Sequence, residues 1–259
     1  MVKVKDIIEK IEKFAPCELA YEWDNTGFIV GNREKEVKKV FLTLDVFKET
    51  VDEAIRMGAD MIISHHPILF KGIQVIDYST QDGYIVSELI KNDIALYCAH
   101  TSMDCAQGGI NDVLANKLGI TDAKVIEKNE SFEGCGLGRI GKISREMTLK
   151  EYAEFVKKQL NTPFVRVCGD FDKKILSVAV GGGACDDLIG DATAMGADVL
   201  VTADMKYHIS QGAVCDGLAI IDAGHYPTEV FVTEIFEEII DGMGLEIFKS
   251  THKDIFEIV

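Results

Sequence analysis

The spacing of apolar residues along the chain predicts helices that alternate with short, buried strands. In the first half, the predicted segments are a helix at residues 4–14, a strand at 39–44, a helix at 48–57, a strand at 61–63, a helix at 83–91 and a strand at 94–98. The helical segments repeat apolar positions at i+3 and i+4, whereas the strands are short apolar runs. Such alternation is typical of α/β proteins, in which helices cover the faces of mostly parallel or mixed sheets.

The second half shows the same alternation. Thr148 and Glu151 form a capping box, which predicts the start of a helix that extends to residue 160. Strand-like runs follow at residues 164–167 and 175–180. The fold class predicted for the whole chain is therefore α/β.

An internal repeat relates the two halves. Three blocks correspond in the same order: residues 38–42 with 173–177 at an offset of 135, residues 57–64 with 195–202 at an offset of 138, and residues 94–97 with 218–221. A longer loop at Gly181-Gly182-Gly183 would absorb the three extra residues of the second offset. No linker rich in proline, glycine or serine separates the halves. We therefore predict two duplicated α/β halves, at residues 1–126 and 127–259.

The charge and the cysteines narrow the possible classes of function. The formal net charge is −16 and the basic residues are scattered, which disfavours proteins that bind nucleic acid or anionic membranes. There is no apolar run of about 18 residues, and the N-terminus lacks the pattern of a secretory signal. Seven cysteines without a Cys-x-x-Cys pair are typical of reduced thiols in a cytosolic protein. We therefore expect a cytoplasmic protein.

Two adjacent histidines end the strand predicted at residues 61–63. His65 and His66 are followed by Pro67, which prevents further ladder pairing. Ligand crevices in open α/β sheets form outside the carboxyl ends of the strands. Adjacent side chains there point in different directions, which suits this pair to two different ions. The alternative is a solvated His-His turn before a proline.

Two more strand ends present a histidine with a carboxylate four residues later. These pairs are His100 with Asp104 and, in the second half, His225 with Glu229. Pro227 is suited to the first turn of a helix, which would bring His225 and Glu229 to one face. Each pair has an ordinary alternative, because His100 can cap its own turn and Glu229 can complement a helix dipole. Their joint occurrence with the His-His motif favours a metal site.

The predicted ligand set is His65, His66, Asp104, His225 and Glu229. Nitrogen and oxygen ligands without cysteine favour a borderline divalent ion (Zn, Fe, Mn, Co or Ni) over calcium. Two carboxylates can bridge two ions about 3.5–4 Å apart, the separation of a two-metal hydrolytic site. Such a site activates water directly, and the sequence has no Gly-x-Ser-x-Gly elbow that would supply a serine nucleophile.

Further positions are candidate contributors. His100, if it is not a ligand, can orient one, bind substrate or carry a proton. His208, which follows Lys206, is a candidate for proton transfer or for meeting an anionic group, although an exposed histidine at a helix start would look the same. Asp24, next to the only tryptophan, is a candidate to support a ligand. The triplet at residues 181–183 resembles a phosphate cradle, with a tight turn as the ordinary explanation.

Several motifs occur together and in one order: Trp23-Asp24-Asn25-x-Gly27, Ile63-Ser64-His65-His66-Pro67, His100-Thr101-x-x-Asp104, Lys206-Tyr207-His208 and Gly224-His225-Tyr226-x-Thr228-Glu229. Together they resemble the NIF-three-like family, whose members are described as type 2 GTP cyclohydrolase I homologues or dinuclear-metal-centre hexameric proteins. The resemblance spans nearly the whole chain. It implies two intertwined α/β halves with mixed sheets, the same five metal ligands, and a toroidal homohexamer with metal sites facing the interior. The short passage from Gly119 to Gly141 leaves no room for the extra domain that some members insert.

The leading hypothesis is a hydrolase with two divalent ions per subunit in the cleft between the halves. Its substrate would be a small phosphorylated or nucleotide-like molecule, and His100 or His208 would assist proton transfer. GTP ring opening is implied by the resemblance alone, since the sequence has no P-loop and lacks the cysteine-containing zinc pattern of type 1 enzymes. The alternatives are a non-catalytic metal-binding regulator or scaffold that acts through protein partners, and a metal store or chaperone.

Overall fold

The computed structural model describes residues 1–72 and 74–257, which form two compact units. Unit 1 comprises Met1–Ala106 and Val232–Lys253, and unit 2 comprises Gln107–Phe231 and the chain from Asp254. The chain therefore leaves unit 1 and later returns to it. This division differs from a split at residue 126, because residues 107–126 group with the second sheet and residues 232–253 with the first.

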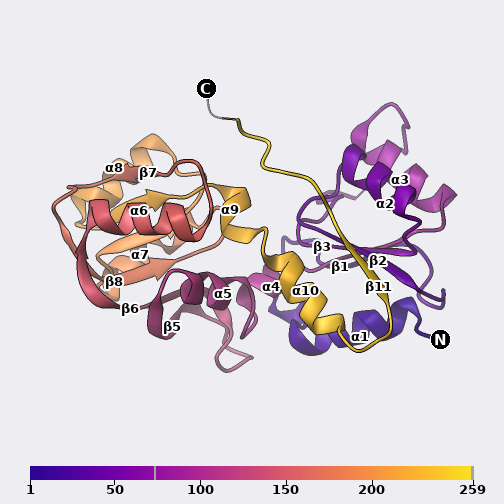
Figure 1. Ribbon diagram of the computed structural model, residues 1–259, viewed down its shortest axis with the longest axis horizontal. Helices are drawn as coiled ribbons and strands as arrows, with labels where there is room; N and C mark the ends of the chain where they lie inside the picture. Colours follow the sequence, from indigo (N-terminus) through magenta and orange to yellow (C-terminus); the bar gives the residue numbers. More distant parts are fainter. Residues whose placement is uncertain (73, 258–259) are drawn as a thin grey trace. The chain divides into compact units, whose positions relative to one another are not determined.

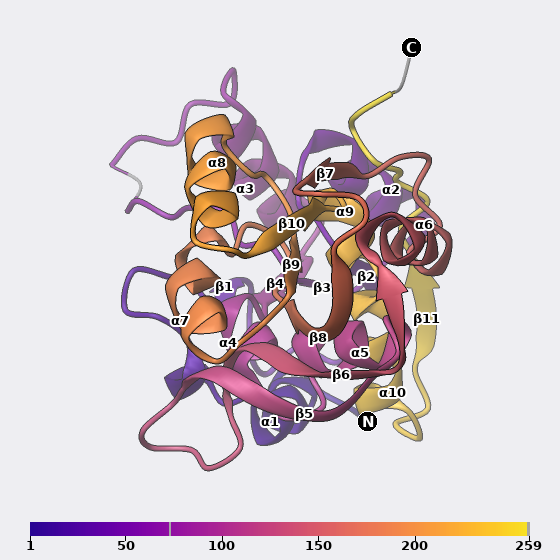
Figure 2. The same cartoon turned by 90° about the vertical axis from the view of Figure 1, so that its left-hand side faces the viewer.

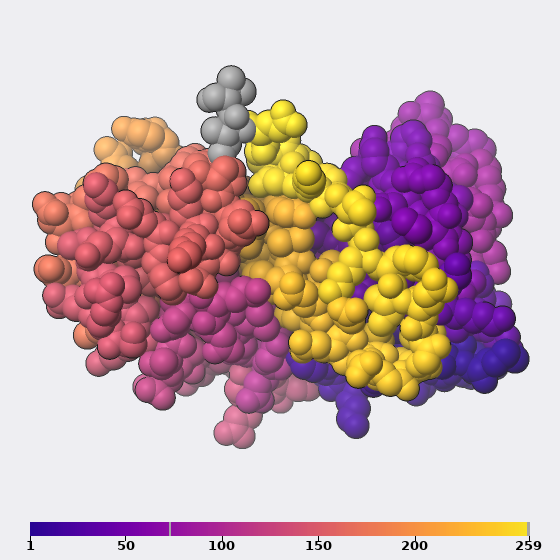
Figure 3. All heavy atoms as spheres, viewed as in Figure 1, coloured from indigo at the N-terminus to yellow at the C-terminus, as the bar shows by residue number. Residues whose placement is uncertain are grey.

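Unit 1 is a five-stranded mixed sheet covered by helices on both faces. Its elements are α1 (Val4–Phe14), the 3-10 helix η1 (Cys17–Leu19), β1 (Gly27–Val30), β2 (Lys39–Thr43), α2 (Lys48–Met57), β3 (Met61–Ser64), α3 (Gln81–Lys91), β4 (Ala95–Cys98), α4 (Thr101–Cys105), α10 (Val232–Ile240) and β11 (Glu246–Lys249). The strand order is β1-β4-β3-β2-β11, with β1 antiparallel to β4 and the other neighbours parallel. Helices α2 and α3 lie on one side of the sheet and α1 and α10 on the other (Figure 1). The returning segment with α10 and β11, in yellow, is part of the surface seen in Figure 3.

Unit 2 is a six-stranded mixed sheet. Its elements are α5 (Ile110–Lys117), β5 (Ile120–Lys128), β6 (Gly136–Thr148), α6 (Leu149–Gln159), β7 (Arg166–Cys168), β8 (Lys174–Val180), the 3-10 helix η2 (Asp186–Leu188), α7 (Ile189–Ala194), β9 (Val199–Thr202), α8 (Tyr207–Cys215), β10 (Ala219–Asp222) and α9 (His225–Glu229). The strand order is β5-β6-β8-β9-β10-β7, and β8, β9 and β10 run parallel. Helices α7 and α8 lie on one side of this sheet and α6 on the other (Figure 2). The predicted α/β class with mixed sheets is confirmed.

The central strands of unit 1 are buried on both faces. Phe41, Ile62 and Leu96 are in register on β2, β3 and β4, and they belong to one core cluster with residues of α2 and α3. Tyr97 faces the other way, and its hydroxyl donates to Glu12 Oε1 of α1 at 3.4 Å. A strand covered on both faces needs apolar residues at every position. That requirement explains why these strands appear in the sequence as continuous apolar runs.

The elements with the clearest periodicity were predicted closely. The helices at residues 4–14 and 48–57 are confirmed in full as α1 and α2, and Thr148 and Glu151 form the predicted capping box of α6. The paired strands β5 and β6 were not predicted, because most residues of β5 are exposed or half-buried and carry little apolar pattern. No helix within the described ranges is long and apolar enough to cross a bilayer.

The duplication is visible in the topology of the two sheets. In unit 1 the parallel strands β2, β3 and β4 are followed across the sheet by the antiparallel strand β1. In unit 2 the parallel strands β8, β9 and β10 are followed by the antiparallel strand β7. The copies diverge at the opposite edge, where β2 pairs with the parallel strand β11 but β8 pairs with the antiparallel strand β6.

The register corrects the alignment of the first repeated block. Val40 pairs with Met61 on β2 and β3, whereas Val178 pairs with Val199 on β8 and β9. Both pairs of residues are 138 positions apart, so the offset of 135 predicted for residues 38–42 is wrong by three residues. The loop at residues 181–183 therefore does not need to absorb an insertion. The sequence comparison aligned Lys38-Lys39 with Lys173-Lys174, and this match is coincidental.

Hydrogen bonds from a lysine side chain to backbone carbonyl oxygens repeat at this same offset. Lys35 Nζ donates to the carbonyl oxygens of Asp60 and Asp93. Lys173 Nζ donates to the carbonyl oxygens of Asp198 and Gly217, at 2.6 Å each. Asp60 and Asp198 are also equivalent, so one lysine ties together the starts of two parallel strands in each unit.

The two histidines at the repeated strand ends are not strict equivalents. Strand β4 ends at Cys98 and β10 at Asp222, which are equivalent positions in the register. His100 is the second residue after its strand, whereas His225 is the third after its own. His225 therefore corresponds to Thr101, and the two histidine–carboxylate pairs are displaced by one residue relative to the repeat.

We predict that the two aspartates at the strand starts contribute equally to stability. Asp60 Oδ2 accepts from the amides of residues 38 and 39, and Asp198 Oδ2 accepts from those of residues 176 and 177, all at 2.8–3.0 Å. Replacing either aspartate with alanine leaves two amides without their acceptor, which we expect to cost about 1–3 kcal/mol. Thermal unfolding of Asp60→Ala and Asp198→Ala, with the exposed Asp216→Ala as control, measures this. An unchanged midpoint for both variants would contradict the prediction.

Candidate metal centre

In unit 1, polar side chains follow the carboxyl ends of three parallel strands. Asp45 follows β2, His65 and His66 follow β3, and His100 follows β4. The strands are parallel and in register, so their ends lie at one edge of the sheet, where ligand crevices form in this class of fold. His65 is fully buried, and the side chains of His66 and His100 are 21% and 15% exposed.

Each of these three histidines is held through its Nδ1 atom by a fixed acceptor. His65 Nδ1 lies 2.9 Å from the carbonyl oxygen of Ala99, His66 Nδ1 lies 2.7 Å from Asp45 Oδ1, and His100 Nδ1 lies 2.8 Å from Asp24 Oδ1. Carbonyl and ionised carboxylate oxygens only accept hydrogen bonds, so Nδ1 must carry the proton. In the neutral imidazole, Nε2 then presents its lone pair, as a metal ligand requires.

The three rings lie close enough to serve one ion or two neighbouring ions. One potential ligand atom from each of His65, His66 and His100 lies within 4.8 Å of those from the other two. The ring centroids of His65 and His66 are 4.9 Å apart, and that of His100 is 5.1 Å from His65. The short helix α4 presents Asp104, whose Oδ1 lies 3.7 Å from His65 Nε2. Four of the residues singled out in the sequence therefore gather in unit 1.

Asp24 is the support of His100 and of the first turn of α4. Its Oδ2 accepts from the Thr101 amide at 3.0 Å and from the Thr101 hydroxyl at 2.6 Å. Burial raises the pKa of the Asp24 carboxyl, but the hydrogen bonds from His100 and Thr101 outweigh it and leave the pKa below its usual value. Asp24 is therefore ionised at neutral pH, which keeps the His100 proton on Nδ1. The supporting role predicted for Asp24 agrees with these contacts.

Unit 2 carries a second histidine–carboxylate pair on the short helix α9. His225 Nε2 and Glu229 Oε2, one helical turn apart, are separated by 3.0 Å. His225 Nδ1 lies 2.7 Å from Asp204 Oδ2, which again directs Nε2 toward the carboxylate. Two acceptor atoms this close need a proton or a cation between them. The helix predicted to bring these residues to one face is present, although it begins at His225 itself.

The glycine triplet makes room for the Glu229 carboxylate. Gly183 has φ +64°, and a Cβ atom there would lie 2.2 Å from Glu229 Oε1. The amides of Gly181, Gly182 and Gly183 donate to the Val201 carbonyl, Asn111 Oδ1 and Thr228 Oγ1. Because all three amides are engaged within the protein, the phosphate-cradle interpretation is wrong. The loop instead allows the backbone to approach a candidate metal ligand closely.

His208 lies on the exposed first turn of α8, where its ring contacts that of Tyr207 at a centroid distance of 5.2 Å. Asp204, four residues earlier, is the residue that contacts His225. A catalytic role for His208 stays a prediction.

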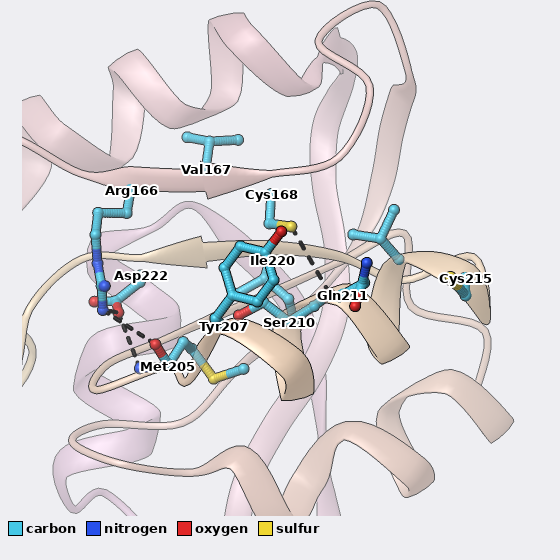
Figure 4. A pocket seen from close by; sticks show the side chains of 11 residues that line it. Arg166, Val167, Cys168, Met205, Tyr207, Ser210, Gln211, Cys215, Ile220 and Asp222 are labelled. Atoms are coloured by element: carbon cyan, nitrogen blue, oxygen red, sulfur yellow. Dashed lines mark hydrogen bonds and ion pairs between the residues drawn. The ribbon is translucent and has the colours of Figure 1, made fainter.

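A separate cavity of about 370 Å³ lies beside α8 (Figure 4). Its described lining comes from β7, α8, β10 and Met205 in the loop before α8, and the Arg166–Asp222 ion pair lies at one end. The side chains of His225 and Glu229 are not among the lining residues. This cavity is therefore distinct from the candidate metal ligands of unit 2.

The donor atoms fit a borderline divalent cation. Imidazole Nε2 atoms and carboxylate oxygens are the ligands of zinc, iron, manganese, cobalt and nickel sites. The carboxylates that hold Nδ1 of His66, His100 and His225 match the outer shell of known metal sites, in which a ligating histidine donates its other N–H to an acceptor. Of these supports, only Asp24 was predicted, and the sequence analysis missed the supporting roles of Asp204 and Asp45. For Asp45, its position just after a predicted strand was the available signal.

Comparisons with known proteins agree over the whole chain. The sequence model of Duf34/NIF3 (NGG1p interacting factor 3) matches residues 2–255. A Clostridium perfringens protein named GTP cyclohydrolase 1 type 2 homolog is 37% identical over 262 residues, covering all of both chains. A solved Bacillus cereus protein related to NIF3 is similar with a TM-score of 0.90 and 30% identity, covering 100% of this chain and 99% of that one. Reduced HcgD from Methanocaldococcus jannaschii is similar with a TM-score of 0.83 and 33% identity, covering 97% and 98%.

We predict that the supporting aspartates tune metal affinity without being ligands. Replacing Asp45 or Asp204 with alanine removes the acceptor that orients His66 or His225, and we expect divalent-metal affinity to fall about 10–100-fold. Competition with a chromophoric chelator measures the affinity. Asp52→Ala, which removes an exposed ion pair with Lys48, is the matched control. Affinities equal to that of the control would contradict the assigned role.

Proposed function

Because this chain belongs to the Duf34/NIF3 family, we propose that it is a dinuclear metal-dependent hydrolase of a small phosphorylated or nucleotide-like molecule. In this proposal, the ligands of two divalent ions are His65, His66, Asp104, His225 and Glu229. The candidate ions are zinc, iron, manganese, cobalt and nickel, because the ligands are nitrogen and oxygen. The reaction takes place in the cytoplasm, a compartment that keeps thiols such as the seven free cysteines reduced.

The orientation of the imidazoles is the observation that carries the proposal. Four histidines from three segments of the chain each have Nδ1 engaged by an acceptor, which leaves Nε2 as the atom that can bind a metal ion: His65, His66, His100 and His225. Histidines with a purely structural role have no reason to share the same hydrogen-bonding pattern at Nδ1. The recurrence of the same tautomer, beside two carboxylates, supports a metal-binding role.

The chemistry divides between the ions and the side chains. Bound divalent ions would polarise a scissile phosphoryl or carbonyl group and lower the pKa of water. His100, paired with the ionised Asp24 carboxylate, is suited to hold or deliver a proton at Nε2. His208 is the second candidate for proton transfer. The nucleotide-like substrate class is supported by the name of the Clostridium perfringens relative, and the absence of a P-loop makes the metal centre the expected anchor of a phosphate.

We predict that Glu229→Gln lowers both metal content and hydrolysis. The substitution keeps the size of the buried side chain but removes its charge, and we expect a loss of at least about 100-fold in the rate of metal-dependent hydrolysis. Elemental analysis of the purified protein gives the metal content, and a panel of phosphoesters and nucleotides gives the rate. Glu238→Gln on α10 is the control.

Turnover that survives in Glu229→Gln would exclude hydrolysis through this site. Normal metal uptake without turnover of any phosphoester or nucleotide would instead favour a non-catalytic role, as a regulator or scaffold for protein partners. A protein that takes up no divalent ion would overturn the metal assignment itself.

We also propose that the protein assembles as a homohexamer, on the basis of its resemblance to hexameric members of the family. Sedimentation equilibrium of the purified protein should then give six times the chain mass of 28.6 kDa. A stable monomer or dimer across the concentration range would contradict the assembly, and it would leave the ligand assignments untouched.

A further inference from the structure

Two exposed aromatic side chains flank the histidine cluster of unit 1. Trp23 is 61% exposed and Phe70 is 53% exposed. Each ring meets that of His100 in a T-shaped contact, with a centroid distance of 6.0 Å in both cases. Single exposed apolar side chains are common, but two aromatic rings exposed on one cluster of polar residues form a patch of the kind that contacts a ligand or a partner. Their position beside His100 points to a ligand that reaches the candidate metal centre.

The tryptophan is held in place although it is exposed. The ring of Tyr21 stacks on the indole at a centroid distance of 5.9 Å and an interplanar angle of 13°. The Tyr21 amide in turn donates to Thr101 Oγ1 at 3.1 Å, which fixes this segment to α4. Trp23 is therefore a pre-positioned ring, so that binding a ligand costs little ordering of the side chain.

The loop that carries Phe70 is tied to the same segment. Asn25 Nδ2 donates to the carbonyl oxygens of Ile68 and Leu69, at 2.9 and 3.1 Å. Leu69 has φ +64°, a left-handed conformation that costs energy for a residue with a side chain. Such backbone strain persists only where the surroundings enforce it. The consecutive residues Trp23, Asp24 and Asn25 thus supply a ring, hold His100 and fix the Phe70 loop.

We propose that Trp23 and Phe70 form an aromatic rim that stacks on the planar ring of a nucleobase-like heteroaromatic substrate. This inference rests on the proposed function, because the rim adjoins the candidate metal centre, and it specifies the substrate class of that site. The rim contacts the ring of the substrate, and the metal-binding residues act on its polar part.

Charge and stacking distinguish this substrate from other candidates. Stacking of a base on an aromatic side chain contributes about 1–3 kcal/mol and requires a flat, polarisable ring, which a sugar phosphate lacks. A nucleic acid strand would need a basic groove along its backbone, but the chain has a net charge of −16. A single nucleotide or a related small heteroaromatic molecule fits both conditions.

The only tryptophan of the chain is Trp23, so intrinsic fluorescence reports directly on the rim. The experiment titrates the metal-loaded protein with guanosine 5′-monophosphate or adenosine 5′-monophosphate, and separately with ribose 5-phosphate. Excitation at the red edge of the indole band limits absorption by the base. We expect saturable quenching by at least one of the two nucleotides and none by ribose 5-phosphate, which carries the same phosphate without the ring.

Substitution of the second rim residue keeps the reporter. Phe70→Leu should weaken nucleotide binding about 10-fold, because it removes one aromatic face. Phe171→Leu, on a phenylalanine with a similar exposure of 51% in unit 2, is the matched control and should bind as the wild type does. Calorimetric titration of Trp23→Leu, which has no fluorophore, should show a loss of similar size. Metal content, measured on every variant, should be unchanged.

Two kinds of result, one from quenching and one from affinity, would contradict the proposed stacking on Trp23 and Phe70. One is quenching by ribose 5-phosphate equal to that by the nucleotides, or no quenching by either nucleotide at millimolar concentration. The other is nucleotide affinity in Phe70→Leu equal to that in Phe171→Leu. In both cases normal metal uptake and metal-dependent hydrolysis of a phosphoester without a ring would leave the proposed function standing. Loss of metal uptake in the wild type would instead mark the failure of the proposed function.

Discussion

The hydrogen bond at Nδ1 of each candidate ligand histidine is the constraint on which the site depends. An imidazole on its own rotates and exchanges tautomers, so it presents either nitrogen. A carbonyl oxygen or an ionised carboxylate at 2.7–2.9 Å removes that freedom for His65, His66, His100 and His225. The acceptors lie at strand ends and on short adjoining segments, so each sheet fixes their positions. The acceptors in turn fix the orientation of the rings and the positions of the Nε2 atoms. The same acceptors increase the basicity of the rings, which favours metal binding.

The two units show how one duplicated strand arrangement supports different chemistry. At the offset of 138 residues, Asp45 corresponds to Gly183 and His66 corresponds to Asp204. In unit 1, Asp45 supports His66, which is itself a candidate ligand. In unit 2, Asp204 takes the supporting role for His225, while the glycine clears space for the Glu229 carboxylate. The position of a candidate ligand in unit 1 is therefore held by a supporting residue in unit 2.

The segment around Trp23 illustrates why short motifs without a regular period still matter. It belongs to no long helix or strand, and two of its residues contact parts of the chain that are distant in sequence. Asp24 reaches His100 across 76 positions, and Asn25 reaches Ile68 across 43. These contacts fix two loops against one another at the end of the sheet. Rigid loops on a rigid scaffold are the usual means of positioning binding groups.

The α/β class, the duplication and the residue types at the strand ends could all be predicted from the sequence alone. These features follow from local information: apolar spacing defines the strands and helices of a buried sheet, and histidine before proline marks the end of a strand. Thr148 and Glu151 are a similar case, since a capping box involves residues only three positions apart.

By contrast, the folded chain is needed to set the register of the repeat, the pairing of β5 with β6, and the partners of each histidine. A half-exposed strand carries little apolar pattern, so its pairing is not encoded locally. The supports Asp45 and Asp204 lie 21 positions from the histidines that they hold, a separation at which only the fold sets the distance. The orientation of an imidazole depends on such an acceptor, which explains why the sequence indicates candidate ligands but not which nitrogen each of them presents.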